Sequence, residues 1–332
     1  EWFNSLSPQA MKGITADQLA HIQTDNFKHW DNEHLTALTA AQVAVAPHLN
    51  ALTSDQFGLL DISGLSTASI TNLTQTEYAG LTLSQFASLS TAQIQAMTHA
   101  QWLPTAVISK LTAEQTAALG NQLAQFTAEQ VAAMNNLQDL NSTQFGLLNI
   151  SGLPTSVIAN LTSIEYVGLT AKQIAAMSAE QINALQHVEL LPVAAMSGFT
   201  AAQMPALSDN VLAHLSADQV AAITHLSALN SQQFGLLNIA HLSESAINSL
   251  SKTEYEGLTA LQISTLSPAQ IHAMAHTSWM PDATASAFTP EQVQNISIGM
   301  NWFSAGWLNN LSIEAFQALT PTQTSQISSA TL

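Results

Sequence analysis

Apolar and polar positions follow one short pattern along most of the chain: Leu or Phe, then Ser or Thr, two variable residues, Gln or Glu, and another apolar residue. Residues 126–131 (Phe-Thr-Ala-Glu-Gln-Val) and 169–174 (Leu-Thr-Ala-Lys-Gln-Ile) are two examples. This is the sequence of a helix capping box. The Ser or Thr hydroxyl accepts the N–H three residues later, and the Gln or Glu accepts the N–H of the cap. The pattern predicts that a helix begins directly after each such Ser or Thr.

The spacing of the predicted caps indicates how long the helices are. Three series of caps lie eight residues apart: Ser66, Thr74, Thr82 and Ser90; Thr162, Thr170 and Ser178; Ser243, Ser251, Thr259 and Ser267. Eight residues allow roughly one and a half helical turns and a corner. Between Ser90 and Asn141 the gaps widen, and we expect helices of two to three turns there. Such short helices are unstable alone because nucleation is costly, so caps and packing on neighbours must hold them.

Proline and glycine positions fit the same interpretation. Four prolines directly follow a Ser or Thr cap: Pro8, Pro268, Pro290 and Pro321. That is the first helical position, where a missing N–H costs nothing. Three glycines follow the helix that contains a tyrosine: Gly80, Gly168 and Gly257. We expect them at left-handed C-terminal caps. Alternating β-branched runs bounded by hairpin turns are absent, so the chain is predicted to be all-α.

A longer repeat of about 88 residues contains these short units. The hexapeptide Phe-Gly-Leu-Leu-Asp/Asn-Ile recurs at 57–62, 145–150 and 234–239. We expect an elongated solenoid of many short helices, continuous along the chain. Its predicted modules are a partial module at 1–52, full modules at 53–140, 141–229 and 230–318, and an edge at 319–332. An insertion rich in aromatic residues interrupts the third full module near 299–307.

Charge is the unusual feature of the composition. Only 8% of the 332 residues are charged, Arg is absent, and five Lys face 22 acidic residues, for a net charge of −17. Because nucleic-acid binding requires basic surface, nucleic-acid partners are not expected. No run of about 18 apolar residues occurs, so membrane insertion is not expected either. Cysteine is absent, which excludes disulfides, thiolate metal sites and Cys nucleophiles.

One unit resembles a known family over six residues. Phe288-Thr289-Pro290-Glu291-Gln292-Val293 is similar to the opening of the repeats of TAL effectors. Those repeats are longer than the eight-residue spacing found here, and they are basic enough to bind DNA. The shared part is the chemistry of a helix start, so the resemblance implies no DNA recognition by this acidic chain.

Aromatic residues are the main candidates for binding. Tyr78, Tyr166 and Tyr255 recur at the apolar position of the repeat, where they form either an aromatic ladder for glycan or peptide stacking or part of the core with the hydroxyl at its edge. Trp302, Phe303 and Trp307 lie in the insertion that breaks the repeat. They are predicted to form either a special contact or a hydrophobic cap that closes the solenoid.

Candidate ionisable sites are weak. His272 and His276 lie four residues apart on a predicted helix, a spacing that can bind a metal, but Ala273 replaces the Glu of the catalytic pattern. A surface pair is the preferred interpretation. The polar cluster of His29, Asp31, Glu33 and His34 favours a solvated helix end over a metal or acid–base site. Glu77, Glu165 and Glu254 are interpreted as capping partners.

These observations favour a non-enzymatic protein without cofactors. The first hypothesis is a structural or adhesive repeat region of an exported bacterial protein, extracellular or at the cell surface, which associates with itself head to tail. The start at Glu1 without Met is expected of a processed product or an excised region. The alternative is a monomeric scaffold that binds a peptide, a glycan or a host protein. An enzyme or metal protein using His272 and His276 is the third.

Overall fold

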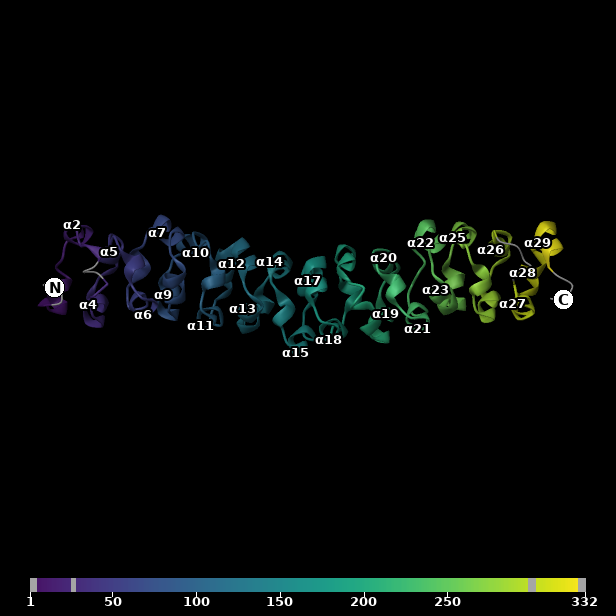
Figure 1. Cartoon of the computed structure of the whole chain (residues 1–332), viewed down its shortest axis with the longest axis horizontal. Coiled ribbons are helices and arrows are strands. Elements are labelled where there is room, and N and C mark those ends of the chain that lie inside the picture. The colour runs from purple at the N-terminus through teal and green to yellow at the C-terminus, as the bar shows by residue number, and fades with distance from the viewer. Residues whose placement is uncertain (1–4, 25–27, 298–302, 328–332) are drawn as a thin grey trace. The chain divides into compact units, whose positions relative to one another are not determined.

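The computed structural model describes residues 5–24, 28–297 and 303–327. Within these ranges the chain forms only α-helices, 3₁₀-helices and turns, without a strand, so the all-α prediction is confirmed. Two compact units are distinguished, Glu1–Pro154 and Thr155–Leu332. Figure 1 shows that the short helices of each unit follow one another in chain order. The division falls inside the predicted module 141–229, and the module boundaries stay predictions.

Unit 1 consists of helices of four to seven residues and of 3₁₀ turns between them. Its α-helices are α1 (Pro8–Met11), α2 (Ala16–Ala20), α4 (Asn32–Ala37), α5 (Ala40–Val43), α6 (Ser54–Phe57), α7 (Thr67–Thr71), α8 (Gln75–Ala79), α9 (Leu83–Ser88), α10 (Thr91–Gln95), α11 (Thr105–Ile108), α12 (Ala113–Leu119), α13 (Ala128–Ala133) and α14 (Ser142–Leu147). Its 3₁₀-helices are η2 (Leu49–Ala51), η3 (Ile62–Gly64), η4 (Ala100–Trp102), η5 (Gly120–Gln125), η6 (Leu137–Asp139) and η7 (Ile150–Gly152).

Unit 2 is built from elements of the same kind. Its α-helices are α15 (Thr155–Ile158), α16 (Ser163–Gly168), α17 (Ala171–Ala176), α18 (Ala179–Asn183), α19 (Asp209–His214), α20 (Ala217–Ala221), α21 (Ser231–Phe234), α22 (Glu244–Asn248), α23 (Lys252–Gly257), α24 (Ala260–Thr265), α25 (Pro268–Ala273), α26 (Pro290–Gln294), α27 (Ala305–Asn310), α28 (Ile313–Gln317) and α29 (Pro321–Gln326). Its 3₁₀-helices are η8 (Val188–Leu190), η9 (Val193–Gly198), η10 (Met204–Ala206), η11 (Leu226–Ala228), η12 (Thr277–Trp279) and η13 (Asp282–Ala287).

The predicted caps begin helices as expected. At α9 the N–H of Gln85 donates to Thr82 Oγ1 at 3.2 Å, and the N–H of Thr82 donates to Gln85 Oε1 at 2.9 Å. The three octad series all begin helices at the predicted residues. Each of the four prolines lies at the start of its helix. The capping pattern alone therefore located these helix starts.

Two details of the prediction are wrong. The wider gaps contain additional short elements instead of longer helices: η4 and α11 lie between Ser90 and Thr112, and the longest helix of unit 1, α12, has seven residues. Among the described residues only Gly120 has a positive φ, so the glycines after the tyrosine helices are not left-handed caps. A Cβ on Gly257 would lie 2.2 Å from the carbonyl oxygen of Ser231. Glycine is present there because the two backbones approach closely.

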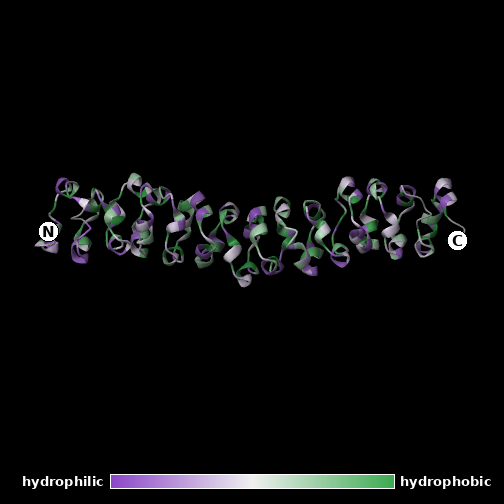
Figure 2. Ribbon diagram, in the orientation of Figure 1, coloured by the Kyte–Doolittle hydropathy of each residue, from purple (hydrophilic) through white to green (hydrophobic). Residues whose placement is uncertain are grey.

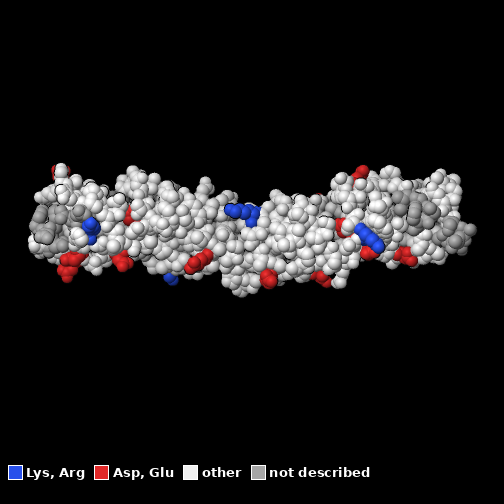
Figure 3. Space-filling model, in the orientation of Figure 1, with Lys and Arg blue, Asp and Glu red and all other residues white. Residues whose placement is uncertain are grey.

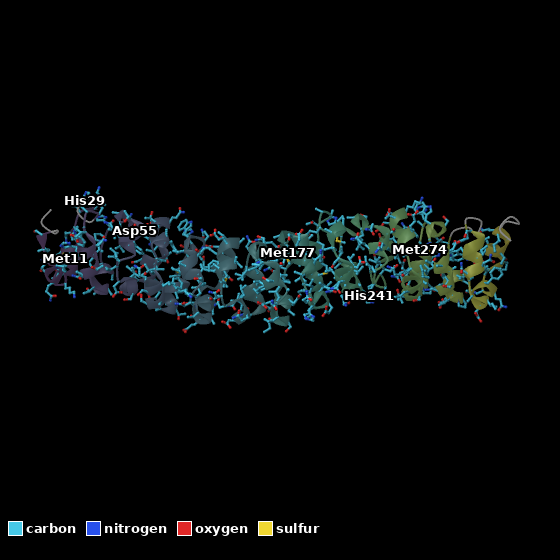
Figure 4. The ribbon with its side chains drawn as sticks, turned by 90° about the horizontal axis from the view of Figure 1, so that it is seen from below. Met11, His29, Asp55, Met177, His241 and Met274 are labelled. Atoms are coloured by element: carbon cyan, nitrogen blue, oxygen red, sulfur yellow. The ribbon has the colours of Figure 1, made fainter. Side chains whose placement is uncertain are left out.

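Both units have an apolar core between helices distant in sequence. Phe57 in unit 1 and Phe234 in unit 2 are fully buried, as are most of the apolar residues that follow the caps. In Figure 2 the short helices carry hydrophobic and hydrophilic residues together. Met177 and Met274, labelled in Figure 4, belong to the core of unit 2. Within the described ranges no helix is both long and apolar enough to cross a membrane.

Buried glutamines join many of the helix starts to segments 25 to 31 residues earlier. The side-chain oxygen of each such glutamine accepts the cap N–H, and Nε2 donates to backbone carbonyls of the earlier segment. We call these residues the cross-segment glutamines: Gln42, Gln85, Gln93 and Gln130 in unit 1, and Gln203, Gln219, Gln233, Gln262, Gln270, Gln292 and Gln323 in unit 2. Each is less than a tenth exposed.

The acceptors of these bonds are backbone carbonyls at or near the end of an earlier helix or turn. Gln262 Nε2 donates to the carbonyls of Phe234 at 2.8 Å and Leu237 at 2.9 Å. Phe234 is the last residue of α21, and its carbonyl also accepts the N–H of Leu237 at 3.1 Å. Among the described residues, no backbone N–H donates to the carbonyl of Leu237, as expected just after a helix end. One side chain thus satisfies the start of one helix and the end of another. Each bond contributes about 1 kcal/mol net, and leaving a buried group unpaired costs more.

Candidate functional site

The three tyrosines are core residues. Tyr78, Tyr166 and Tyr255 have no exposed surface. The hydroxyl of Tyr78 accepts the N–H of Thr98 at 3.0 Å, and that of Tyr166 accepts the N–H of Gln186 at 2.7 Å. Burial raises the pKa of the Tyr255 phenol above its usual value. The rings offer no face to a glycan or peptide, so an aromatic ladder is corrected to core packing with a hydrogen-bonded hydroxyl.

Histidine and tryptophan rings that keep some exposed surface lie next to Tyr78 and Tyr255. His99 stacks on Trp102 with ring centroids 4.0 Å apart, and His276 stacks on Trp279 at 3.9 Å. Tyr78 contacts the first pair edge-on. These histidine–tryptophan pairs were not predicted from the sequence. The signal was present, because His lies three residues before Trp in both places.

In the insertion near 299–307, the two aromatic residues that the structure describes pack against the core. Phe303 and Trp307 are buried, with ring centroids 4.1 Å apart, and Trp307 also contacts Phe288 edge-on at 5.5 Å. Trp302 lies outside the described residues. The geometry of the two described rings fits the hydrophobic cap of the two alternatives, since buried rings cannot form an external contact.

His272 and His276 do not share a helix. α25 ends at Ala273, and His276 precedes η12. The ring of His272 lies 3.3 Å from the carbonyl oxygen of Asn295, whereas His276 stacks on Trp279. The predicted spacing of four along one helix face is therefore absent. In the ranges that the structure describes, no group of three or more His, Asp or Glu residues is arranged to hold a metal.

The polar cluster at the start of α4 is organised around His34. Its Nδ1 lies 2.5 Å from Asp31 Oδ1, and its Nε2 lies 2.8 Å from the carbonyl oxygen of Leu6. The bond to the Asp31 carboxylate raises the pKa of His34, and the backbone N–H of His34 lowers the pKa of Asp31. Because both ring nitrogens face acceptors, the charged imidazolium is favoured and no nitrogen is left to bind a metal.

The three repeated glutamates are capping partners, as predicted. Glu77 accepts the N–H of Thr74, Glu165 that of Thr162 and Glu254 that of Ser251, each at 2.6 Å. All three are at most 4% exposed. A carboxylate cannot donate, however, so these residues cannot make the second bond of the cross-segment glutamines.

The surface carries few charges and several exposed apolar side chains. Figure 3 shows isolated acidic and basic residues on a mostly uncharged face. Ile164 and Val167, three residues apart on α16, are 54% and 58% exposed, and Leu261 on α24 is 76% exposed. Lys252 pairs with Glu256 at 3.6 Å on α23. Uncharged, partly apolar surface of this kind is typical of protein contacts.

At two places only one half of the cross-segment contact is present among the described residues. In unit 1, Gln18 accepts the N–H of Thr15 at 2.8 Å, but its Nε2 has no partner among the described residues and the side chain is exposed. In unit 2, the carbonyls of Phe316 and Leu319 follow cap Ser312 at the positions where Phe234 and Leu237 follow cap Asn230. Within the described chain no glutamine donates to them. The sequence analysis missed both groups because it assigned glutamine only to capping.

The sequence matches no known protein family, and comparison with curated proteins finds none with significant similarity.

Proposed function

We propose that the chain is a non-enzymatic structural repeat region that associates with copies of itself head to tail. In this proposal the cross-segment contacts continue as one solenoid, with modules of about 88 residues. The observation that carries it is the repetition of the cross-segment contact, in which a glutamine amide donates to carbonyls 25 to 31 residues earlier, as Gln262 does to Phe234 and Leu237. Among the described residues, neither Gln18 Nε2 nor the carbonyl of Leu319 has such a partner. When donors on one copy of the chain meet acceptors at a different place on the next copy, the contact is heterologous. Such a contact extends into filaments unless it closes into a ring.

The amino-acid composition supports the proposed location of the protein. An acidic chain without Arg or Cys, rich in uncharged polar residues, suits an exported bacterial protein at the cell surface or outside the cell. The net charge of −17 opposes association, but the charges are sparse and salt screens repulsion beyond about 8 Å at physiological ionic strength. A repeat region that associates with itself in this way can also adhere to a protein or glycan surface.

Light scattering after size exclusion, with negative-stain images of the same fractions, tests the proposal. We expect concentration-dependent species larger than the 35.2 kDa chain, and filaments in the images. Gln18→Glu keeps an acceptor for the cap N–H but removes the amide donors, so it should reduce association. Asp17→Asn changes an exposed neighbour and serves as the control. A monodisperse monomer at all concentrations would contradict self-association.

The exposed apolar residues favour a second candidate, a monomeric scaffold that binds a peptide, glycan or host protein. Ile164 and Val167 lie on one face of α16, where a partner surface would cover them. If the chain is monomeric, binding to a candidate partner should be weakened by Ile164→Ser together with Val167→Ser. Unchanged binding in that variant would exclude this face.

A further inference from the structure

The carboxylate of Glu254 replaces an amide at a place where other segments require a donor. Residues 28 and 25 positions earlier are Leu226 and Leu229, the same offsets at which Gln262 bonds Phe234 and Leu237. No side chain of the described chain donates to the carbonyls of Leu226 and Leu229. The carbonyl of Leu226 accepts the backbone N–H of Leu229 at 3.0 Å. What this place lacks, compared with Gln262, is the side-chain donor.

One oxygen of Glu254 has no protein partner. Oε2 accepts the N–H of Ser251 at 2.6 Å, whereas Oε1 has no hydrogen bond to any described residue, although the residue is only 4% exposed. The nearest lysine on the helix, Lys252, pairs with Glu256 instead. Because Oε1 is not among the fully buried side-chain atoms without a partner, it keeps contact with solvent, and an external cation or strong donor can reach it.

A pocket of about 210 Å³ adjoins this carboxylate. Ile223, Leu242 and Leu250 form its apolar wall, and all three side chains are buried. Exposed Thr224 and Ser249 line the pocket as well, which places part of its lining at the solvent. For comparison, an engineered protein cavity of about 150 Å³ accommodates benzene. The pocket is thus large enough for a short alkyl chain beside a polar group.

The same replacement occurs in unit 1. Glu77 is 3% exposed, its Oε2 accepts the N–H of Thr74, and Leu49 and Leu52 occupy the positions 28 and 25 residues earlier. No described side chain donates to those two carbonyls either. η2 before Glu77 and η11 before Glu254 also share a loosely packed start, since neither contains a fully buried residue. The arrangement is therefore a recurring feature of the repeat.

We propose that the pocket at Glu254 binds a primary alkylammonium group, either a small amine or a lysine side chain of another protein. The ammonium would donate to Glu254 Oε1 and to the carbonyl of Leu226, while its methylenes contact the apolar wall. Three donors on one cation suit a site made only of acceptors. The strong excess of acidic over basic residues would also raise the local concentration of cations.

Amide chemical shifts of the 332-residue chain, followed by NMR, test this inference. We expect n-butylammonium and Nα-acetyl-lysine amide to shift the amides of residues 224–227 and 251–257 in a saturable manner. The uncharged counterparts, n-butanol and the Nε-acetylated lysine derivative, should bind much more weakly. Binding of n-butylammonium alone would identify a site for small amines, and binding of the lysine derivative as well would identify a site open to protein lysines.

Glu254→Gln is the decisive variant, because glutamine occupies the equivalent position elsewhere and preserves the fold. It should weaken ammonium binding by roughly tenfold or more, because charge-assisted hydrogen bonds are much stronger than neutral ones. Lys252→Gln, on the same helix but turned to Glu256, should leave binding unchanged. Absence of saturable shifts, equal shifts with butanol, or unchanged binding in Glu254→Gln would overturn the inference. None of these results depends on Gln18, so failure of self-association would leave this test intact.

Discussion

Gln262→Glu tests the energetic role of the cross-segment glutamines with almost no change of volume. The variant keeps an oxygen for the N–H of Thr259, which Gln262 accepts at 3.0 Å. It loses both donor bonds, to Phe234 at 2.8 Å and to Leu237 at 2.9 Å, and it places a carboxylate oxygen against those carbonyls. The side chain is 4% exposed, so water cannot easily replace the lost partners.

The two lost bonds together account for about 2 kcal/mol of the free energy of unfolding. An unpaired buried charge raises the cost to about 3–5 kcal/mol, as when one partner of a buried pair is removed. The penalty should decrease on acidification, because a protonated carboxyl can donate one hydrogen bond. Acidification should therefore reduce the stability difference between the variant and the wild type, whereas ordinary acid denaturation destabilises a protein as the pH falls.

Urea denaturation followed by circular dichroism at neutral pH measures the loss. Hydrogen exchange of peptides that cover α21 and α24 shows whether it is local to unit 2. Gln232→Glu makes the same chemical change at an exposed position in the first turn of α21 and should be neutral or slightly stabilising. If Gln262→Glu stays within about 0.5 kcal/mol of the wild type, the range of ordinary surface substitutions, the reasoning is refuted.

Three further variants probe other features of the fold. Thr170→Ala should cost about 1 kcal/mol in thermal or urea unfolding by removing a cap; if Thr162, Thr170 and Ser178 all tolerate Ala without change, caps do not hold these helices. His34→Asn should abolish a pH dependence of the stability of unit 1. The pKa of His34 is raised in the folded protein, so the bond to Asp31 stabilises fully below the ordinary pKa of 6.5, and this stabilisation is lost as the pH rises through the folded pKa. A wild type that is equally stable on both sides of that pH window would contradict this. Gly257→Ala should destabilise by about 3 kcal/mol through overpacking, whereas a neutral result would mean that the backbones separate easily.

The local features of the fold were predictable from the sequence. Capping requires only residues three positions apart, so Thr82 with Gln85 is visible in a short window, and Pro268 after Ser267 marks a helix start without any tertiary information. Helix existence and class followed from these signals. The lengths of the helices between Ser90 and Thr112 did not, because 3₁₀ turns such as η4 lack a comparable signature.

The contacts between segments were missed because they depend on residues 25 to 31 positions apart. A signal was nevertheless available. Glu satisfies a capping box as well as Gln and suits the helix dipole better, yet most units carry Gln, which indicates that a donor is needed. The exceptions, Glu77, Glu165 and Glu254, then mark the places where the donor is absent. Likewise, Gly257 was predicted to form a left-handed C-terminal cap, since its close approach to Ser231 involves distant residues.

The most direct test of the account is the exchange rate of glutamine side-chain amide protons in the native protein, measured by NMR. If Gln262 Nε2 donates to two buried carbonyls, its protons should exchange with solvent far more slowly than those of exposed Gln232. The same protection should hold for the other cross-segment glutamines. Exchange of the Gln262 amide as fast as that of Gln232 would contradict the claim that these side chains join successive segments.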